Sequence, residues 1–292
     1  MSRRDPEWRD FARLASTLLI APRAERLLLL LLLCLPAAGA AQSPGAIVGP
    51  NVTDAPAAAS NSPGEVDRKV SWKLLPSNVV HDQKPIWLFP VRVAQGKHLK
   101  PALAFVLATA GLVALDPHDT PYFRRTDTFQ DFNRVFSGRN TALASAVFPL
   151  SFYAVGLARR DRYAQNTALL AGEAVLDSEF VTLVMKNVDR RLRPSDISPQ
   201  GDFSHTWFKS HGRFISGRGS FPSGHTIAAF SVATIFAERY KRHRWVPWVA
   251  YPLAGLVGFS RVPLQSHFPS DVFAGAVLGY SISRFAVLQQ RP

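Results

Sequence analysis

The sequence predicts an all-α fold, a bundle of about six core helices. Apolar segments of helical length recur between about residues 102 and 287, and the strict apolar–polar alternation typical of strands is nearly absent there. Several of these segments end at proline or at a group of charged residues, as helices do. Together, the segment lengths, the missing alternation and the end signals favour helix packed on helix.

The expected core helices can be justified in order along the chain. They cover residues 102–115, 142–158, 165–186, 224–240, 246–259 and 270–287. The first is expected to end at Asp116-Pro117, because proline cannot continue the hydrogen-bond ladder of a helix. The second ends in a charged run at 159–162. A polar and aromatic stretch, 118–139, connects these two.

The N-terminus has the pattern of an export signal. Arg23 and Arg26 precede an apolar run at 27–35, and small residues at 38–40 offer a cleavage site. The run is too short to span a bilayer comfortably. We therefore expect a cleaved signal peptide at 1–41 and a protein exported to the periplasm.

The remaining chain divides by composition. Residues 42–66 are rich in Ala, Ser, Pro, Gly and Asn and are expected to form a disordered linker. We expect an N-terminal helical extension at 67–139 and a catalytic domain at 140–288. Cys34 is the only cysteine and lies in the expected signal, so the mature chain could form no internal disulfide.

The apolar segments leave the relation to the membrane open. They run about 14–19 residues, at or below the 20 or so that a spanning helix requires. The segment at 165–186 also carries three acidic residues, which are costly inside a bilayer. These features favour a soluble or membrane-peripheral bundle, with a polytopic membrane protein as the alternative.

The formal net charge of +13 suits an anionic partner. Nucleic acid, acidic lipid headgroups and phosphorylated substrates all fit such a charge. Three short clusters in the C-terminal half favour a phosphorylated small molecule or lipid over nucleic acid, with a membrane surface as a possible second partner.

The first cluster is Lys186 with Arg193 and Pro194. Lys186 and Arg193 stand seven residues apart, so two helical turns would point both cations to one side. Arginine can donate a fork of two hydrogen bonds to phosphate, while lysine acts as a compact charge. The alternative is a solvated basic face that also includes Arg190 and Arg191.

The second cluster, Pro222-Ser223-Gly224-His225, leads into a helix. A helix N-terminus offers free N–H groups to an anion, and Gly224 lets the backbone approach it. Ser223 could donate to phosphate or cap the helix. His225 could protonate a departing alkoxide or be structural.

The third cluster is Ser260-Arg261 followed by His267 and Asp271. A carboxylate beside one imidazole nitrogen fixes the tautomer and leaves the other nitrogen free to attack. Arg261 adds a third cation for the charge on a transferring phosphoryl group. An incidental histidine near a helix cap is the alternative.

The three motifs, Lys-x6-Arg-Pro, Pro-Ser-Gly-His and Ser-Arg-x5-His-x3-Asp, resemble those of the type 2 phosphatidic acid phosphatase and haloperoxidase superfamily. The resemblance covers about residues 140–288 without substitution at a motif position. It implies a helical phosphatase that hydrolyses a phosphomonoester or pyrophosphate through a phosphohistidine, with a lipid phosphate or another extracytoplasmic organic phosphate as substrate.

The resemblance also implies residue roles. His267 would be the nucleophile, Asp271 would orient it, and His225 would be the general acid and then the base. The phosphate-binding residues would be Lys186, Arg193, Ser223, Gly224 and Arg261. No metal or other cofactor is implied for hydrolysis.

Two other functions stay open. A vanadate-dependent haloperoxidase would use the same residues to hold vanadate as a cofactor. A non-catalytic anion-binding envelope protein would keep the pocket without the chemistry, although binding alone needs neither the two histidines nor the carboxylate.

Overall fold

The computed structural model describes residues 68–210 and 218–289, which are helical wherever they are regular. From Arg68 onward the chain forms one compact unit. The expected signal peptide at 1–41 and the linker at 42–66 lie outside the described residues.

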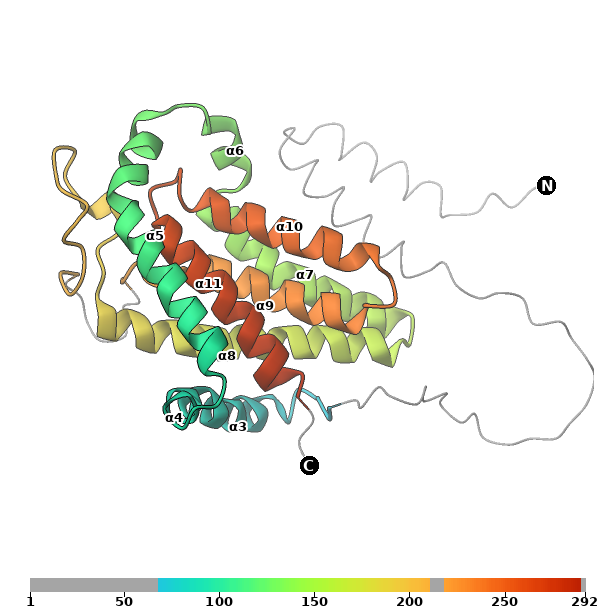
Figure 1. Ribbon diagram of the computed structural model, residues 1–292. Coiled ribbons are helices and arrows are strands. Elements are labelled where there is room, and N and C mark those ends of the chain that lie inside the picture. Colours follow the sequence, from blue (N-terminus) through green and yellow to red (C-terminus); the bar gives the residue numbers. More distant parts are fainter. Residues whose placement is uncertain (1–67, 211–217, 290–292) are drawn as a thin grey trace, which may run out of the picture. The chain divides into compact units, whose positions relative to one another are not determined.

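Six long helices form the bundle, as the sequence predicts (Figure 1). They are α5 (Leu99–Arg125), α7 (Gly138–Ala158), α8 (Arg162–Asp189), α9 (Gly224–Arg239), α10 (Trp245–Ser260) and α11 (Pro269–Ile282). The last continues into a short π-helical segment, η2 (Ser283–Val287). Shorter helices precede or connect these: α3 (Leu75–Trp87), α4 (Phe89–Ala94), α6 (Gln130–Val135) and the 3₁₀ turn η1 (Pro194–Asp196).

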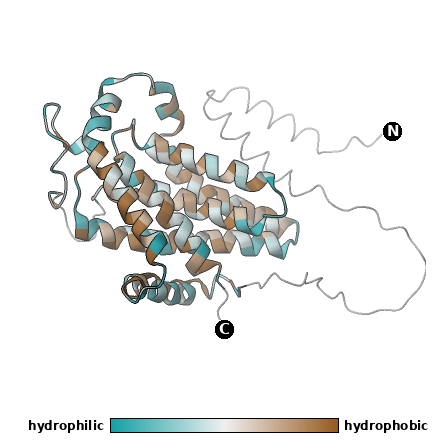
Figure 2. Ribbon diagram, in the orientation of Figure 1, coloured by the Kyte–Doolittle hydropathy of each residue, from teal (hydrophilic) through white to brown (hydrophobic). Residues whose placement is uncertain are grey.

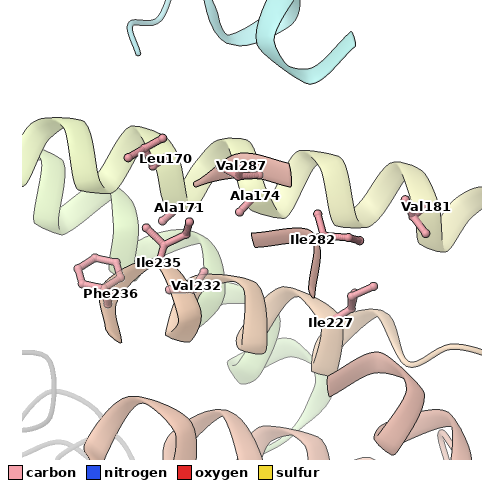
Figure 3. Packing of buried hydrophobic residues seen from close by; sticks show 10 residues of the cluster. All are labelled: Leu170, Ala171, Ala174, Val181, Ile227, Val232, Ile235, Phe236, Ile282 and Val287. Atoms are coloured by element: carbon pink, nitrogen blue, oxygen red, sulfur yellow. The ribbon is translucent and has the colours of Figure 1, made fainter. Parts of the chain in front are cut away.

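Helix α9 lies at the centre of the bundle and is buried along nearly its whole length. It packs against α8, α10 and α11, and α7 packs mainly on α8. Figure 3 shows the resulting core, in which Ile227, Val232, Ile235 and Phe236 of α9 face apolar residues of α8 and the end of α11. Burial of this apolar surface is what holds the bundle together.

Helix α5 departs from the prediction at its C-terminal end. It continues past Asp116 and includes both Pro117 and Pro121. The expectation that it ends at Asp116-Pro117 is therefore wrong. Packing overrides the proline signal here, because Asp116 and Thr120 are buried, and the Thr120 hydroxyl donates to the Asp116 carbonyl at 2.6 Å.

Two helices are long and apolar enough to cross a membrane, by length and composition. They are α5, with 27 residues, and α7, with 21. The expectation that the apolar segments fall short of a span is thus wrong for these two. Only 6% of the apolar window of α5 and 17% of that of α7 is buried inside the protein, so most of each window faces outward.

Apolar residues recur along all the bundle helices, while polar residues gather near helix ends and in connections (Figure 2). Leu107 of α5 is 70% exposed, Leu150 of α7 is 56% exposed and Trp248 of α10 is 81% exposed. Exposed apolar surface on this scale marks an interaction surface. It supports association of the protein with a membrane.

Candidate phosphate-transfer site

The three predicted clusters meet at one end of the bundle (Figure 1). This end contains the C-termini of α8 and α10 and the N-termini of α9 and α11, joined by the loops that follow α8 and α10. Lys186 and Arg193 interact electrostatically with both His225 and His267. The structure therefore brings the cations and both imidazoles of the three clusters together.

The first cluster is not built as two turns of helix. Helix α8 ends at Asp189, and Arg190 has a left-handed backbone with φ of 46°. Arg193 is extended and Pro194 opens the η1 turn. The helical argument for Lys186 and Arg193 is therefore wrong, although the two side chains still lie within electrostatic range of each other.

His267 is buried and held through Nδ1. This nitrogen lies 2.7 Å from the carbonyl oxygen of Ser220 and 3.7 Å from Asp271 Oδ2. A carbonyl can only accept, so Nδ1 carries the proton and Nε2 keeps its lone pair. The imidazole is thus oriented by a backbone carbonyl, while the Asp271 carboxylate adds negative charge at ion-pair distance.

The Asp271 carboxylate is itself fixed from several directions. Its Oδ2 accepts from the Ser220 hydroxyl at 2.5 Å and from the Phe268 N–H at 2.9 Å. Its Oδ1 accepts from Arg191 at 2.6 Å. Burial opposes its ionisation, but Arg191, His267 and Ser220 together hold the pKa of Asp271 below its ordinary value.

Ser220 and Arg191 are site residues that sequence reasoning missed. Arg191 is only 1% exposed, so the alternative of a solvated basic face is wrong for this residue. The left-handed turn at Arg190 breaks the helical spacing on which that assignment depended. Ser220 acts through its backbone carbonyl as well as its hydroxyl, and no side-chain motif reveals a carbonyl contact.

Arg261 and His225 meet the connection between α6 and α7. Arg261 is 1% exposed and donates to the Phe136 carbonyl and to Ser260 Oγ. His225 Nε2 lies 3.0 Å from the carbonyl of Gly138, to which it donates. The start of α7 therefore covers one side of the site.

Ser223 and Gly224 lie at the start of α9, opposite α8. Ser223 is fully buried and makes no capping hydrogen bond; its oxygen accepts from the Thr226 hydroxyl at 2.8 Å. That leaves its own hydrogen available for an anion. A β-carbon built at Gly224 would lie 3.8 Å from Lys186 Nζ, so glycine keeps open the space beside this ammonium.

Burial and mutual repulsion lower the pKa values of the cationic groups and the histidines in the site. Burial, with Arg193 nearby, lowers the pKa of Lys186 to about 8, and burial lowers the pKa of Arg261 to about 10. Burial and the neighbouring cations also lower the pKa of His267 to about 4 and that of His225 below its ordinary value. A site of this kind gains from binding an anion, which relieves the crowding of positive charge.

The loop between the first two clusters packs onto the site. Phe203 contacts Phe268 and the Arg124 guanidinium, and Trp207 contacts Phe221. Phe208, by contrast, is 73% exposed. Phe203 and Trp207 thus hold this loop against the site.

One group of carboxylates in the described part of the chain has metal-ligand spacing. Asp82, Glu173 and Asp177 are buried, and their oxygens lie within 4.8 Å of one another. Arg68 already forms ion pairs with Asp82 and Glu173. Glu173 precedes Lys186 by 13 residues on α8, about 20 Å along a helix, so this group lies apart from the phosphate site.

Comparison with known proteins places this site in a family. Residues 167–292, which include all three clusters, match the family model of the PAP2 superfamily. These residues form a PAP2 superfamily domain. The expected family is confirmed, and the all-α fold expected with it agrees with the structure.

The chain is also similar to individual curated proteins. It is similar to the lipid A 1-phosphatase of Rhizobium etli, with 37% identity over 107 residues, 36% of this chain and 42% of that protein. It is also similar to the bacitracin transport permease protein BcrC of Bacillus licheniformis, with 45% identity over 60 residues, 20% of this chain and 28% of that protein. The chain thus spans less than half the length of these curated relatives.

Among solved structures, the chain resembles a transmembrane PAP2 type phosphatidylglycerolphosphate phosphatase from Bacillus subtilis. The TM-score is 0.45 and the identity 24%, over 63% of this chain and 92% of that one.

Proposed function

We propose that this protein is a membrane-associated lipid phosphate phosphatase that works through a phosphohistidine on His267. The observation that carries the proposal is the buried His267, whose Nδ1 proton is held by the Ser220 carbonyl so that Nε2 keeps a free lone pair. A neutral imidazole with a fixed tautomer is a nucleophile, whereas simple anion binding needs none. The PAP2 segment and its lipid A 1-phosphatase relative support the same reaction class.

The phosphate group would bind among Lys186, Arg193 and Arg261, with Ser223 and the N–H groups at the start of α9 as further donors. Gly224 leaves room for the phosphate oxygens beside Lys186. Fixed cations and helix N–H groups stabilise the charge that gathers on the equatorial oxygens during transfer. No group in this set requires a metal to do so.

Transfer then takes two steps that balance in atoms and protons. The lone pair of His267 Nε2 attacks phosphorus, the bond from phosphorus to the ester oxygen breaks, and protonated His225 gives its proton to the departing alkoxide. Neutral His225 next takes a proton from water as that water attacks phosphorus, the phosphorus–nitrogen bond breaks, and inorganic phosphate leaves. Because His225 Nε2–H is donated to Gly138, the proton that moves is the one on Nδ1.

The proposed substrate is a phosphate monoester or pyrophosphate on a lipid. The apolar surfaces of α5 and α7 would hold the protein at the bilayer, where such substrates reside. The export signal predicted at 1–41 would place the site on the periplasmic side. The similarity to a lipid A 1-phosphatase favours hydrolysis over the haloperoxidase alternative.

The test uses the purified full-length protein in detergent micelles with a panel of lipid phosphates, lipid pyrophosphates and soluble sugar phosphates. Phosphate release should be fastest from one of the lipids, and vanadate should inhibit it. Radiolabelled substrate quenched in alkali should leave label on the protein, and His267→Ala should lose both label and turnover while keeping its helical circular dichroism. Normal turnover by that variant would exclude the proposed nucleophile.

A further inference from the structure

A buried arginine connects Asp271 to a helix outside the segment that matches the family. Arg191 donates from Nη1 to Asp271 Oδ1 and from Nη2 to Asp116 Oδ2, each at 2.6 Å. Asp116 lies on α5, which precedes the matched residues 167–292. All three side chains are at most 1% exposed, so these charges meet away from bulk water.

The Arg191 guanidinium is held on its remaining sides as well. Its Nε donates to Thr206 Oγ1 at 3.1 Å and Nη1 donates to Ser270 Oγ at 2.7 Å. Its plane lies against Phe268 and Trp207, with centroid distances of 4.1 and 4.6 Å. A planar guanidinium with every nitrogen hydrogen-bonded cannot rotate. The Asp271 carboxylate that it binds is therefore fixed as well.

Burial raises the pKa of Asp116, and the charge and hydrogen bonds of Arg191 and Ser270 oppose that shift. Besides Arg191, its carboxylate accepts from the Ser270 N–H at 3.2 Å and from the Ser270 hydroxyl. Hydrogen bonds donated to a carboxylate favour its charged form. Ser270 therefore contacts both Asp116 and Arg191, immediately before Asp271 in the chain.

The charges along this chain of contacts do not cancel. Two carboxylates, Asp116 and Asp271, face one guanidinium, so with both carboxylates ionised the group carries one net negative charge. Without Asp116, Arg191 would neutralise Asp271, and His267 would face a neutral pair. A phosphorylated imidazole is cationic, and inside a buried site such a charge needs a nearby counter-charge.

We propose that Asp116 and Arg191 act together as a positioning pair for phosphoryl transfer. Arg191 holds Asp271 with its Oδ2 toward His267. Asp116 neutralises the charge of Arg191. Asp271 therefore still compensates the positive charge that His267 gains as it bonds to phosphorus. The inference rests on the proposed function and adds to it a residue supplied by α5.

The test compares Asp116→Asn with Asp119→Asn, an exposed position on the same helix. If the pair acts in the transition state, Asp116→Asn should lower kcat about 10- to 100-fold, as outer partners of reacting groups do, and change KM by less than about threefold. Vanadate, which can bond to the nucleophile as the transition state does, should inhibit Asp116→Asn more weakly by a similar factor. Inorganic phosphate, bound only by the cations, should inhibit both forms equally, and Asp119→Asn should match the wild type.

The outcomes separate this inference from the proposed function. An active wild type with an unchanged kcat in Asp116→Asn overturns the positioning pair alone, as does an equal loss of vanadate and phosphate affinity. A wild type that is inactive on every phosphate ester overturns both. If Asp116→Asn does not fold, Asp116→Glu and Arg191→Lys carry the same comparison, since Glu restores the charge and Lys cannot bridge both carboxylates.

Discussion

Gly279 of α11 lies directly against the backbone carbonyl of Ile227 in α9, and a β-carbon at Gly279 would overlap that oxygen. One turn earlier, a β-carbon at Gly275 would come within 2.8 Å of the Ser223 carbonyl. These two glycines let the backbones of α9 and α11 approach closely. The approach sets the start of α9, with Ser223 and His225, beside the start of α11, with Asp271.

Replacing Gly279 by alanine should therefore destabilise the protein and reduce its activity. The added methyl group meets backbone rather than a flexible side chain, so α9 and α11 must separate, at a cost of about 1–3 kcal/mol in the free energy of unfolding. Gly172→Ala on α8 is the control, because nothing lies within 4 Å of its β-carbon. Thermal unfolding in micelles measures both; equal stability of the two variants would contradict the close approach.

Ser220→Ala should reduce turnover while leaving phosphate binding nearly intact. The hydroxyl donates to Asp271 Oδ2 at 2.5 Å, and a hydrogen bond to a charged group contributes about 1.5–3 kcal/mol, or about 10- to 100-fold in rate. The Ser220 carbonyl still holds His267, so some activity should remain. A residual rate as low as that of His267→Ala would show that the serine does more than support Asp271.

How much the sequence could predict depends on which group makes each contact. Helix lengths and breaks predicted the six core helices, and the three motifs predicted eight residues that the structure gathers at one end of the bundle. Their chemical roles remain predictions.

Other contacts could not be predicted from motifs. The His267 partner is a main-chain carbonyl, which every residue possesses. Arg191 leaves the helical pattern at a single left-handed residue, Arg190. Asp116 approaches from α5, and the two prolines that seemed to end that helix lie within it.

The lowered pKa of Lys186 predicts an alkaline limit to substrate binding. With burial and Arg193 lowering this pKa to about 8, the ammonium loses its proton as the pH rises through 8 in the free protein. The attraction of the Lys186 ammonium for the phosphate is thus present below pH 8 and lost above it. The value of kcat/KM should therefore fall above pH 8.

The variant Lys186→Arg tests this origin of the limit. A guanidinium keeps its charge to higher pH than an ammonium does, so the fall in kcat/KM should move to higher pH. Lys84→Arg, at an exposed position on α3, should leave the profile unchanged. An alkaline limit that stays in place in Lys186→Arg would assign it to another group.

His225→Asn should make the rate depend more steeply on the leaving group. The shorter asparagine amide loses both the proton donor and the hydrogen bond from Nε2 to the Gly138 carbonyl, and loss of that contact affects all esters alike. Acidic phenols leave without a proton, so the cleavage of their esters should slow the least. Esters of aliphatic alcohols need one, and their cleavage should slow about 10²- to 10⁴-fold, the usual contribution of general acid catalysis.

The exposed loop residue His205 provides the matched control, and His205→Asn should cleave both ester classes at the wild-type rate. Burial and the neighbouring Arg261 lower the pKa of free His225, which favours its neutral form. A bound phosphate brings negative charge beside the imidazole, which raises this pKa and supplies the proton when it is needed. Equal slowing of both ester classes in His225→Asn would assign His225 to binding rather than to proton transfer.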